Sequence, residues 1–129
     1  MAADRILVDS SVFIDFFRKK NKDKTVLYRL FQRNANLFIS SLTVYELLCG
    51  AKTPNLKKDT EKLLTTVSTI AFGADEANIA SQLYYDLKSK NQLVGPIDIL
   101  IAATAIYHAL PIATCNKEHF NRFNDLVLI

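Results

Sequence analysis

The stretch RILVDSSVFIDFF, residues 5–17, decides the fold of this chain. Residues 6–8 form a continuous apolar run, which predicts a short strand buried on both faces, as the strands of parallel sheets are. Asp9 ends the run, and a helix is predicted from Val12 to Arg18, with one of the serines at 10–11 as its N-cap. A strand that leads directly into a helix is the repeating unit of α/β folds.

The same strand-then-helix unit recurs along the rest of the chain. Further strands are predicted at residues 37–39, 68–72, 112–114 and 126–129. Helices are predicted around Val26, from Ser40 or Ser41, from Lys57, from Asp75 and from Ile97, with a turn at residues 53–55 and a short helix or turn at 116–120. The alternation predicts an α/β fold in which helices cover both faces of a parallel sheet.

The composition is that of one compact domain that comprises residues 1–129, half of them hydrophobic. No run reaches the roughly 18 apolar residues of a membrane helix, and the N-terminus does not read as a signal peptide, so a cytoplasmic location is expected. The net charge of +3 permits a polyanionic partner without requiring one. Cys49 and Cys115 do not make a disulfide framework, and Cys115 is predicted to be a small buried residue.

Four polar residues are expected to meet at one edge of the sheet. Ligands bind parallel sheets beyond the carboxyl ends of the strands. Asp9 directly follows the first strand, Asn116 follows the fourth, Glu46 lies shortly after the second, and Asp98 lies in the first turn of a helix. A buried acid is costly unless it has a partner, a metal ion or water, so three acids in one small domain suggest a shared cation site.

Each acid also has a purely structural explanation. Asp9 could be a helix N-cap, although the serines at 10–11 could fill that position equally well. Glu46 could close a capping box with Thr43, and Asp98 could complement the dipole of its helix. The shared cation site is favoured because one explanation then covers all three acids.

The other polar residues near these acids have simpler explanations. His108 lies near a helix C-terminus, and His119 is isolated, with no second histidine at metal-ligand spacing, so zinc is not favoured. The basic run from Arg18 to Lys24 is predicted to be a solvated loop. As an alternative, its cations could contact phosphates beside the acids.

An all-oxygen ligand set favours Mg²⁺, or Mn²⁺ as a substitute, over zinc or copper. A divalent cation offsets the repulsion between carboxylates, lowers the pKa of a bound water and neutralises a phosphate. The predicted reaction is therefore metal-assisted hydrolysis of a phosphodiester. Other phosphate chemistries lack their motifs, because the chain has neither G-x-G-x-x-G nor G-x-x-x-x-G-K-[ST], and Asp9 is not part of an Asp-x-Asp pair.

Four motifs, in this order, resemble those of the PIN-domain ribonucleases, and most closely those of the VapC-type toxins of prokaryotic toxin–antitoxin pairs. They are VDSSVFIDFF with Asp9, TVYELLCGA with Glu46, IDILIAATA with Asp98 and ATCNKEHF with Asn116. The likeness covers nearly the whole chain. It implies a three-layer α/β/α sandwich with a central, mostly parallel sheet, a homodimer, Mg²⁺-dependent cleavage of RNA, and a cognate antitoxin that blocks the acidic groove.

The resemblance also implies a role for each of the four motif residues. Asp9, Glu46 and Asp98 are expected to hold the metal ion, and Asn116 is expected to assist them in catalysis. Many relatives carry Asp where this chain has Asn116. A neutral amide holds a second ion less tightly than a carboxylate does, so the number of metal ions stays open.

Residues around the motifs receive supporting roles. Ser10 or Ser11 is expected to orient a carboxylate or a water ligand. The candidates for contacts with RNA phosphates are three consecutive basic residues, Arg18, Lys19 and Lys20. These roles predict an active site flanked by positive charge.

Three other functions fit parts of the sequence. A PIN-like module that has lost catalysis and binds RNA or a protein is favoured by Asn116, and it predicts little affinity for Mg²⁺ or Mn²⁺. A DNA-directed nuclease related to the flap endonucleases would carry more acids and larger insertions. A plain α/β domain whose acids cap helices predicts that no property depends on metal.

Overall fold

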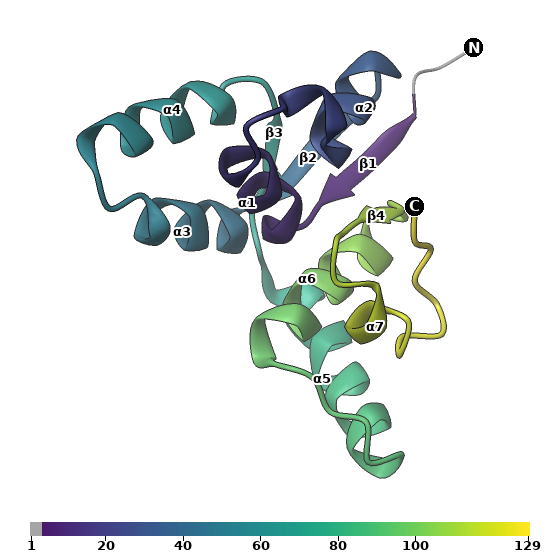
Figure 1. Cartoon of the computed structure of the whole chain (residues 1–129). Coiled ribbons are helices and arrows are strands. Elements are labelled where there is room, and N and C mark those ends of the chain that lie inside the picture. The colour runs from purple at the N-terminus through teal and green to yellow at the C-terminus, as the bar shows by residue number, and fades with distance from the viewer. Residues whose placement is uncertain (1–3) are drawn as a thin grey trace.

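The computed structural model describes residues 4–129 and consists of a parallel sheet with helices packed against both faces (Figure 1). Residues 1–3 lie outside the described residues, so the start of the predicted domain and the first residues of the N-terminus that the signal-peptide prediction concerns fall there. The strands are β1 (Arg5–Val8), β2 (Asn36–Ser40), β3 (Ser68–Ile70) and β4 (Ile112–Ala113). The helices are α1 (Ser10–Arg18), α2 (Val26–Gln32), α3 (Ser41–Gly50), α4 (Pro54–Leu64), α5 (Ala74–Ser89), α6 (Pro96–Tyr107) and α7 (Lys117–Phe120), with a 3-10 turn, η1 (Lys22–Lys24).

The four strands are parallel and lie in the order β3-β2-β1-β4. The chain therefore builds the sheet outward from β1 to β3 on one side, and then returns to place β4 on the other side of β1. The register pairs Leu7 with Ile112 and Val8 with Ala113. Because the strand order reverses between β1 and β4, a crevice for ligands is expected beyond the carboxyl ends of these two strands.

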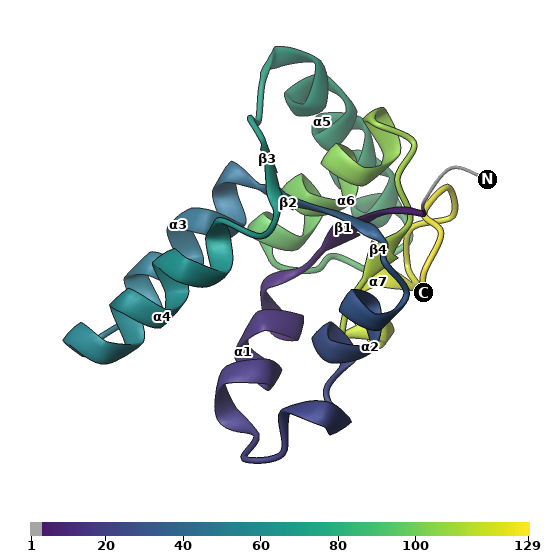
Figure 2. The ribbon, with the colours of Figure 1, turned by 90° about the horizontal axis from the view of Figure 1, so that it is seen from above.

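The alternation of side chains along β1 divides the core into two layers. Leu7 packs into a cluster with α5 and α6, whereas Ile6 and Val8 face the opposite cluster with α1 and α2. All three side chains are completely buried. Figure 2 shows the same division, with α1 and α2 on one side of the sheet and α5 and α6 on the other. The three-layer α/β/α sandwich is thus confirmed.

Helix α6 is the most deeply buried helix, as its apolar sequence predicts. Gly95 precedes it at the N-cap position and Pro96 fills its first position, where a missing N–H costs no hydrogen bond. Ala102, Ala103 and Ala105 are fully buried, and these small side chains let the helix approach the sheet closely. This packing fixes the first turn of α6 beside the end of β1.

Two predicted elements, a turn and a strand, are wrong. Residues 53–55 are not a turn, because Pro54 begins α4 and the Thr53 hydroxyl caps it by accepting the N–H of Leu56 at 3.1 Å. Residues 126–129 do not form a strand, because Leu128 makes only a single bridge with Ile112. Since β4 is two residues long, the C-terminal segment finds a single pairing position there.

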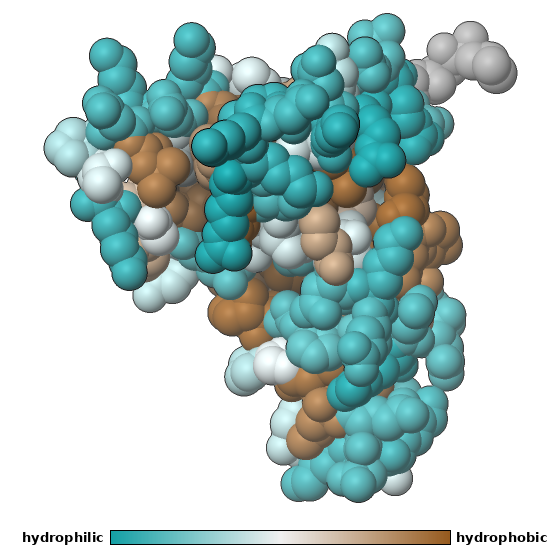
Figure 3. Space-filling model, in the orientation of Figure 1, coloured by the Kyte–Doolittle hydropathy of each residue, from teal (hydrophilic) through white to brown (hydrophobic). Residues whose placement is uncertain are grey.

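The surface exposes apolar side chains in separate patches. Figure 3 shows hydrophobic patches separated by hydrophilic residues. Tyr84 and Tyr85 on α5 are 38% and 67% exposed, whereas Phe16 and Phe17 pack against the core. Within residues 4–129, none of the helices has both the length and the apolar composition needed to cross a membrane.

Candidate active site

Asp9 lies at the carboxyl end of β1, and its carboxylate turns toward the end of β4. The side chain occupies the N-cap position of α1 but makes no capping hydrogen bond, so neither the cap explanation of Asp9 nor the predicted serine cap is correct. Its Oδ2 instead accepts hydrogen bonds from Ser11 Oγ at 2.7 Å and from Thr114 Oγ1 at 2.9 Å. Only 4% of Asp9 is exposed, so these two hydroxyls replace much of the water that an ionised carboxylate needs.

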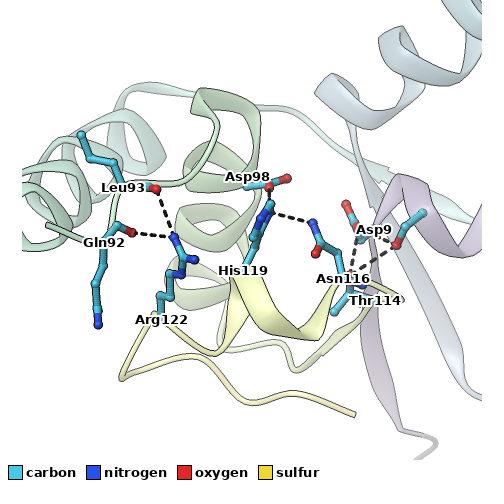
Figure 4. A network of polar contacts seen from close by, with 9 residues as sticks. Asp9, Gln92, Leu93, Asp98, Thr114, Asn116, His119 and Arg122 are labelled. Atoms are coloured by element: carbon cyan, nitrogen blue, oxygen red, sulfur yellow. Dashed lines mark hydrogen bonds and ion pairs between the residues drawn. The ribbon is translucent and has the colours of Figure 1, made fainter.

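Thr114 joins the ends of β1 and β4. Its hydroxyl donates to Asp9 and accepts the backbone N–H of Asn116 at 2.9 Å. Ser11 completes the network, since its Oγ lies 3.3 Å from Thr114 Oγ1 and accepts the N–H of Cys115 at 2.9 Å. The network holds Asp9 and Asn116 close to Thr114, at the ends of β1 and β4 (Figure 4).

Glu46 lies in the middle of α3 and does not cap it. The helix begins at Ser41 with Ser40 as its N-cap, one turn before the predicted capping box of Thr43 and Glu46 would start it. The Oε1 atom of Glu46 is buried and has no hydrogen-bond partner among the described residues. An unpartnered buried carboxylate oxygen is costly, and it is a position that a cation would satisfy.

Burial is the main cause that raises the pKa of Glu46 above its usual value, followed by the negative charge of Asp9. The nearby hydroxyl of Ser10 lowers this pKa, and the charge of Asp98 raises it further. Glu46 therefore lies within electrostatic reach of both other acids.

Asp98 lies in the first turn of α6, as predicted, and contacts α7. Its Oδ2 is 3.3 Å from Nδ1 of His119. Burial raises the pKa of Asp98, the hydrogen bond from His119 lowers it, and the charge of Asp9 raises it. The strand-and-helix pattern thus brings the three acids into one electrostatic group.

These residues fit a hydrated divalent cation better than a tightly caged one. Among residues 4–129, no three His, Cys, Asp or Glu side chains converge closely enough to enclose a metal ion. Magnesium, however, usually keeps several waters and takes only one or two protein carboxylates. Mutual repulsion between acids and a buried oxygen without a partner are the features that such a cation would offset.

His119 and Thr114 are site residues that the sequence patterns did not identify. The prediction that His119 is isolated is wrong, because its ring contacts both Asp98 and Asn116. Thr114 is the polar residue that ends the buried strand β4, as Asp9 ends β1, and that likeness could have identified it. The prediction that Cys115 is buried is also wrong: it lies exposed, two residues beyond the end of β4.

The basic residues lie at the C-terminal end of α1. Arg18, Lys19 and Lys20 are exposed, and Lys19 Nζ lies 3.1 Å from Asp15 Oδ1. Arg18 also lines a cavity of about 310 Å³ between α1, α3 and α4, and Glu46 lies in the wall of the same cavity. Positive charge thus reaches the edge of the acid group.

Comparison with known proteins places the chain in a family. A model of the PIN domain matches residues 6–126. Ribonuclease VapC1 of Methanocaldococcus jannaschii is 30% identical over 125 residues, which are 96% of this chain and 85% of that protein. The tRNA(fMet)-specific endonuclease VapC of Shigella flexneri is 28% identical over 126 residues, which are 95% of this chain and 94% of that protein.

A solved structure, described as a toxin–antitoxin complex from Klebsiella pneumoniae, contains a similar chain. It superposes with a TM-score of 0.76 at 27% identity, and covers 98% of this chain and 96% of that one. The chain belongs to the PIN-domain family. Within that family it is of the VapC type, as its relatives of similar length are.

Proposed function

We propose that this protein is an endoribonuclease, the toxin of a toxin–antitoxin pair, and that it hydrolyses RNA phosphodiester bonds with Mg²⁺. The observation that carries the proposal is the group of three acids at the switch point of the sheet, in which Glu46 keeps a buried oxygen without a partner. Relatives that cover nearly the whole chain are named as ribonucleases, one of them specific for a tRNA, which supports RNA as the substrate.

Asp9, Glu46 and Asp98 would hold the cation, with Asn116 beside them as a neutral oxygen donor. When bound, Mg²⁺ or Mn²⁺ would lower the pKa of a water molecule and neutralise charge that develops on the phosphate. The three acids give the site its affinity for the cation. Without the cation, the negative charge of the acids repels RNA.

The remaining residues position these acids and the substrate. Ser11 and Thr114 hold the carboxylate of Asp9 in one orientation, which is the supporting role that serines and threonines play around metal ligands. Arg18, Lys19 and Lys20 would attract the RNA backbone to the edge of the site. Because Lys19 already pairs with Asp15, Arg18 and Lys20 should contribute more than Lys19 to RNA binding.

We propose two protein partners as well. The structural relative that is described as a toxin–antitoxin complex supports a cognate antitoxin that covers the acidic site. A homodimer is supported by the exposed tyrosines of α5 and by the apolar groove of about 450 Å³ between α5 and α6, since α5 presents apolar surface to solvent. Sedimentation of the purified chain, alone and with Tyr84→Ser, tests the dimer.

Cleavage of a labelled pool of structured RNA that includes tRNA tests the activity. Purified protein is incubated with Mg²⁺ or with a chelator, and Asp98→Asn serves as the control for contaminating nucleases. We expect cleavage that requires the metal and is lost in the variant, while the variant stays folded. Wild-type cleavage rates in Asp98→Asn would show that the site is assigned wrongly.

Parallel reactions separate the proposal from its rivals. A preference for DNA of the same sequence would make the protein a DNA-directed nuclease instead. An absence of cleavage together with no heat of Mg²⁺ or Mn²⁺ binding would favour a PIN-like binding module, which Asn116 would suit.

A further inference from the structure

His119 occupies a central place between two of the proposed cation-binding residues. It lies on α7, three residues after Asn116, and its ring stands between Asn116 and Asp98 (Figure 4). Its Nδ1 lies 2.9 Å from Asn116 Nδ2 and 3.3 Å from Asp98 Oδ2. Nδ1 thus faces both Asp98 on α6 and Asn116, the N-cap residue of α7.

With the Asn116 amide as it stands, neither protonation state of Nδ1 satisfies both of its neighbours. If Nδ1 carries a lone pair, it accepts from the Asn116 amide, but it then faces the carboxylate of Asp98 with acceptor against acceptor. If Nδ1 carries a proton, it donates to Asp98 but faces the NH₂ group of Asn116 with donor against donor. Half a turn of the amide brings the Asn116 oxygen to the place of its nitrogen.

With the amide turned, Nδ1 of His119 faces two oxygen acceptors, the Asp98 carboxylate and the Asn116 amide. A proton on Nδ1 would satisfy both oxygens, and a cation bound to the Nδ1 lone pair would take the same two oxygens as ligands. The partly exposed His119 ring leaves its Nε2–H free to reach water.

We propose that His119 is a nitrogen ligand of the divalent cation, together with Asp98 and Asn116, and that it biases the site toward Mn²⁺ over Mg²⁺. This inference rests on the cation site of the proposed function. Mg²⁺ and Mn²⁺ both take oxygen ligands, but Mn²⁺ accepts an imidazole nitrogen more readily than Mg²⁺ does, so a nitrogen donor strengthens Mn²⁺ binding more than Mg²⁺ binding. Because the amide of Asn116 is neutral, the affinity for a cation bound beside it depends on His119.

Pulsed electron paramagnetic resonance of bound Mn²⁺ tests the ligand directly, because a coordinated ¹⁴N modulates the electron spin echo. The chain has only two histidines, so His108→Gln is the matched control. His108 lies at the C-terminal end of α6, where its Nε2 is 3.7 Å from Glu76 Oε2. We expect ¹⁴N modulation in the wild type and in His108→Gln, and its loss in His119→Gln.

Calorimetry with Mn²⁺ and with Mg²⁺ tests the selectivity. His119→Gln should weaken Mn²⁺ binding about tenfold or more and Mg²⁺ binding much less. His119→Asp, which restores an oxygen ligand, should bind Mg²⁺ at least as well as the wild type and should still lack the ¹⁴N signal. Circular dichroism shows whether each variant is folded, and the aspartate variant decides the question if the glutamine variant is not.

The outcomes separate this inference from the function on which it rests. Mn²⁺ that binds the wild type without ¹⁴N modulation, or with modulation that survives in His119→Gln, would overturn the role of His119 and leave the ribonuclease proposal standing. A wild-type protein that binds neither cation would overturn both. Metal-dependent RNA cleavage with all-oxygen coordination would overturn only the inference.

Discussion

At the residue scale, the hydroxyl of Thr114 shows how a buried carboxylate is supported. Asp9 is almost completely buried, and Thr114 supplies one of its two hydroxyl donors from the neighbouring strand end. Because a carboxylate that loses a donor in a dry site is not compensated by water, this hydrogen bond should matter more than one at the surface.

We expect Thr114→Val to lower the free energy of unfolding by about 1–3 kcal/mol, because the methyl group replaces the hydroxyl without satisfying Asp9. Urea unfolding measures the loss. Thr104→Val is the matched control, since Thr104 is equally buried but its hydroxyl bonds only to the backbone oxygen of Leu100 in its own helix. Equal losses in both variants would mean that the hydrogen bond to Asp9 stabilises the fold no more than a bond to a helix carbonyl does.

Glu46 gives a prediction of the opposite sign. Its pKa is raised in the folded protein, so the ionised side chain makes the folded state less stable than a neutral one would. Without added cation, Glu46→Gln should raise the unfolding temperature by a few degrees, which corresponds to about 1 kcal/mol or less because the side chain is partly solvated.

Thermal unfolding in chelator measures this change. Glu61→Gln, on the solvent face of α4, is the control and should leave the unfolding temperature nearly unchanged. A lower unfolding temperature for Glu46→Gln would show that the glutamate has a stabilising partner and is not held against repulsion.

At the scale of elements, the boundaries of α3 and α4 show how local capping decides where a helix begins. Each helix starts after a residue whose hydroxyl accepts the N–H two or three positions on, namely Ser40 and Thr53. For α3, this earlier start leaves Glu46 in the middle of the helix, so its side chain is free for the site. The cap therefore decides the role of the glutamate.

We expect Thr53→Ala to cost about 1 kcal/mol, since the alanine cannot accept the N–H of Leu56. Denaturant titration of the whole chain measures the change. Thr66→Ala is the control. Thr66 lies exposed beyond the end of α4, and its hydroxyl donates to the backbone oxygen of Leu63. This variant should change stability by about 0.5 kcal/mol or less. Similar values for the two variants would argue that Thr53 is not a functional cap.

At the scale of the whole molecule, the cation site should couple to folding. The acids lie at the end of β1, on α3 and on α6, which come together only in the folded chain. A cation that binds them binds the folded state alone, and at 100 times its dissociation constant it should add about 2.7 kcal/mol to stability.

Calorimetric scans with MgCl₂ or MnCl₂, against KCl of equal ionic strength, test this coupling. The wild type should unfold at a higher temperature with either divalent salt, and Asp98→Asn should lose most of the increase. The same increase in the variant would indicate binding somewhere other than the acid site.

Several features of this protein follow from its sequence alone. The apolar run at residues 6–8 and the acid behind it predict a strand that presents Asp9 at its carboxyl end, because hydrophobic periodicity is a local property of the chain. The same reasoning predicts the α/β class and the placement of Glu46 and Asp98 near that end. The buried character of α6 is predicted for the same reason, since its sequence is apolar nearly all round.

Only the tertiary structure decided how these residues meet. Thr114 contacts Asp9 across 105 positions of sequence and His119 contacts Asp98 across 21, so no local pattern could pair them. The C-terminal segment reads as a strand, yet it makes a single bridge, because its partner β4 is only two residues long. Local propensity determines the elements, whereas the strand order, which places β4 beside β1, determines the contacts that make the site.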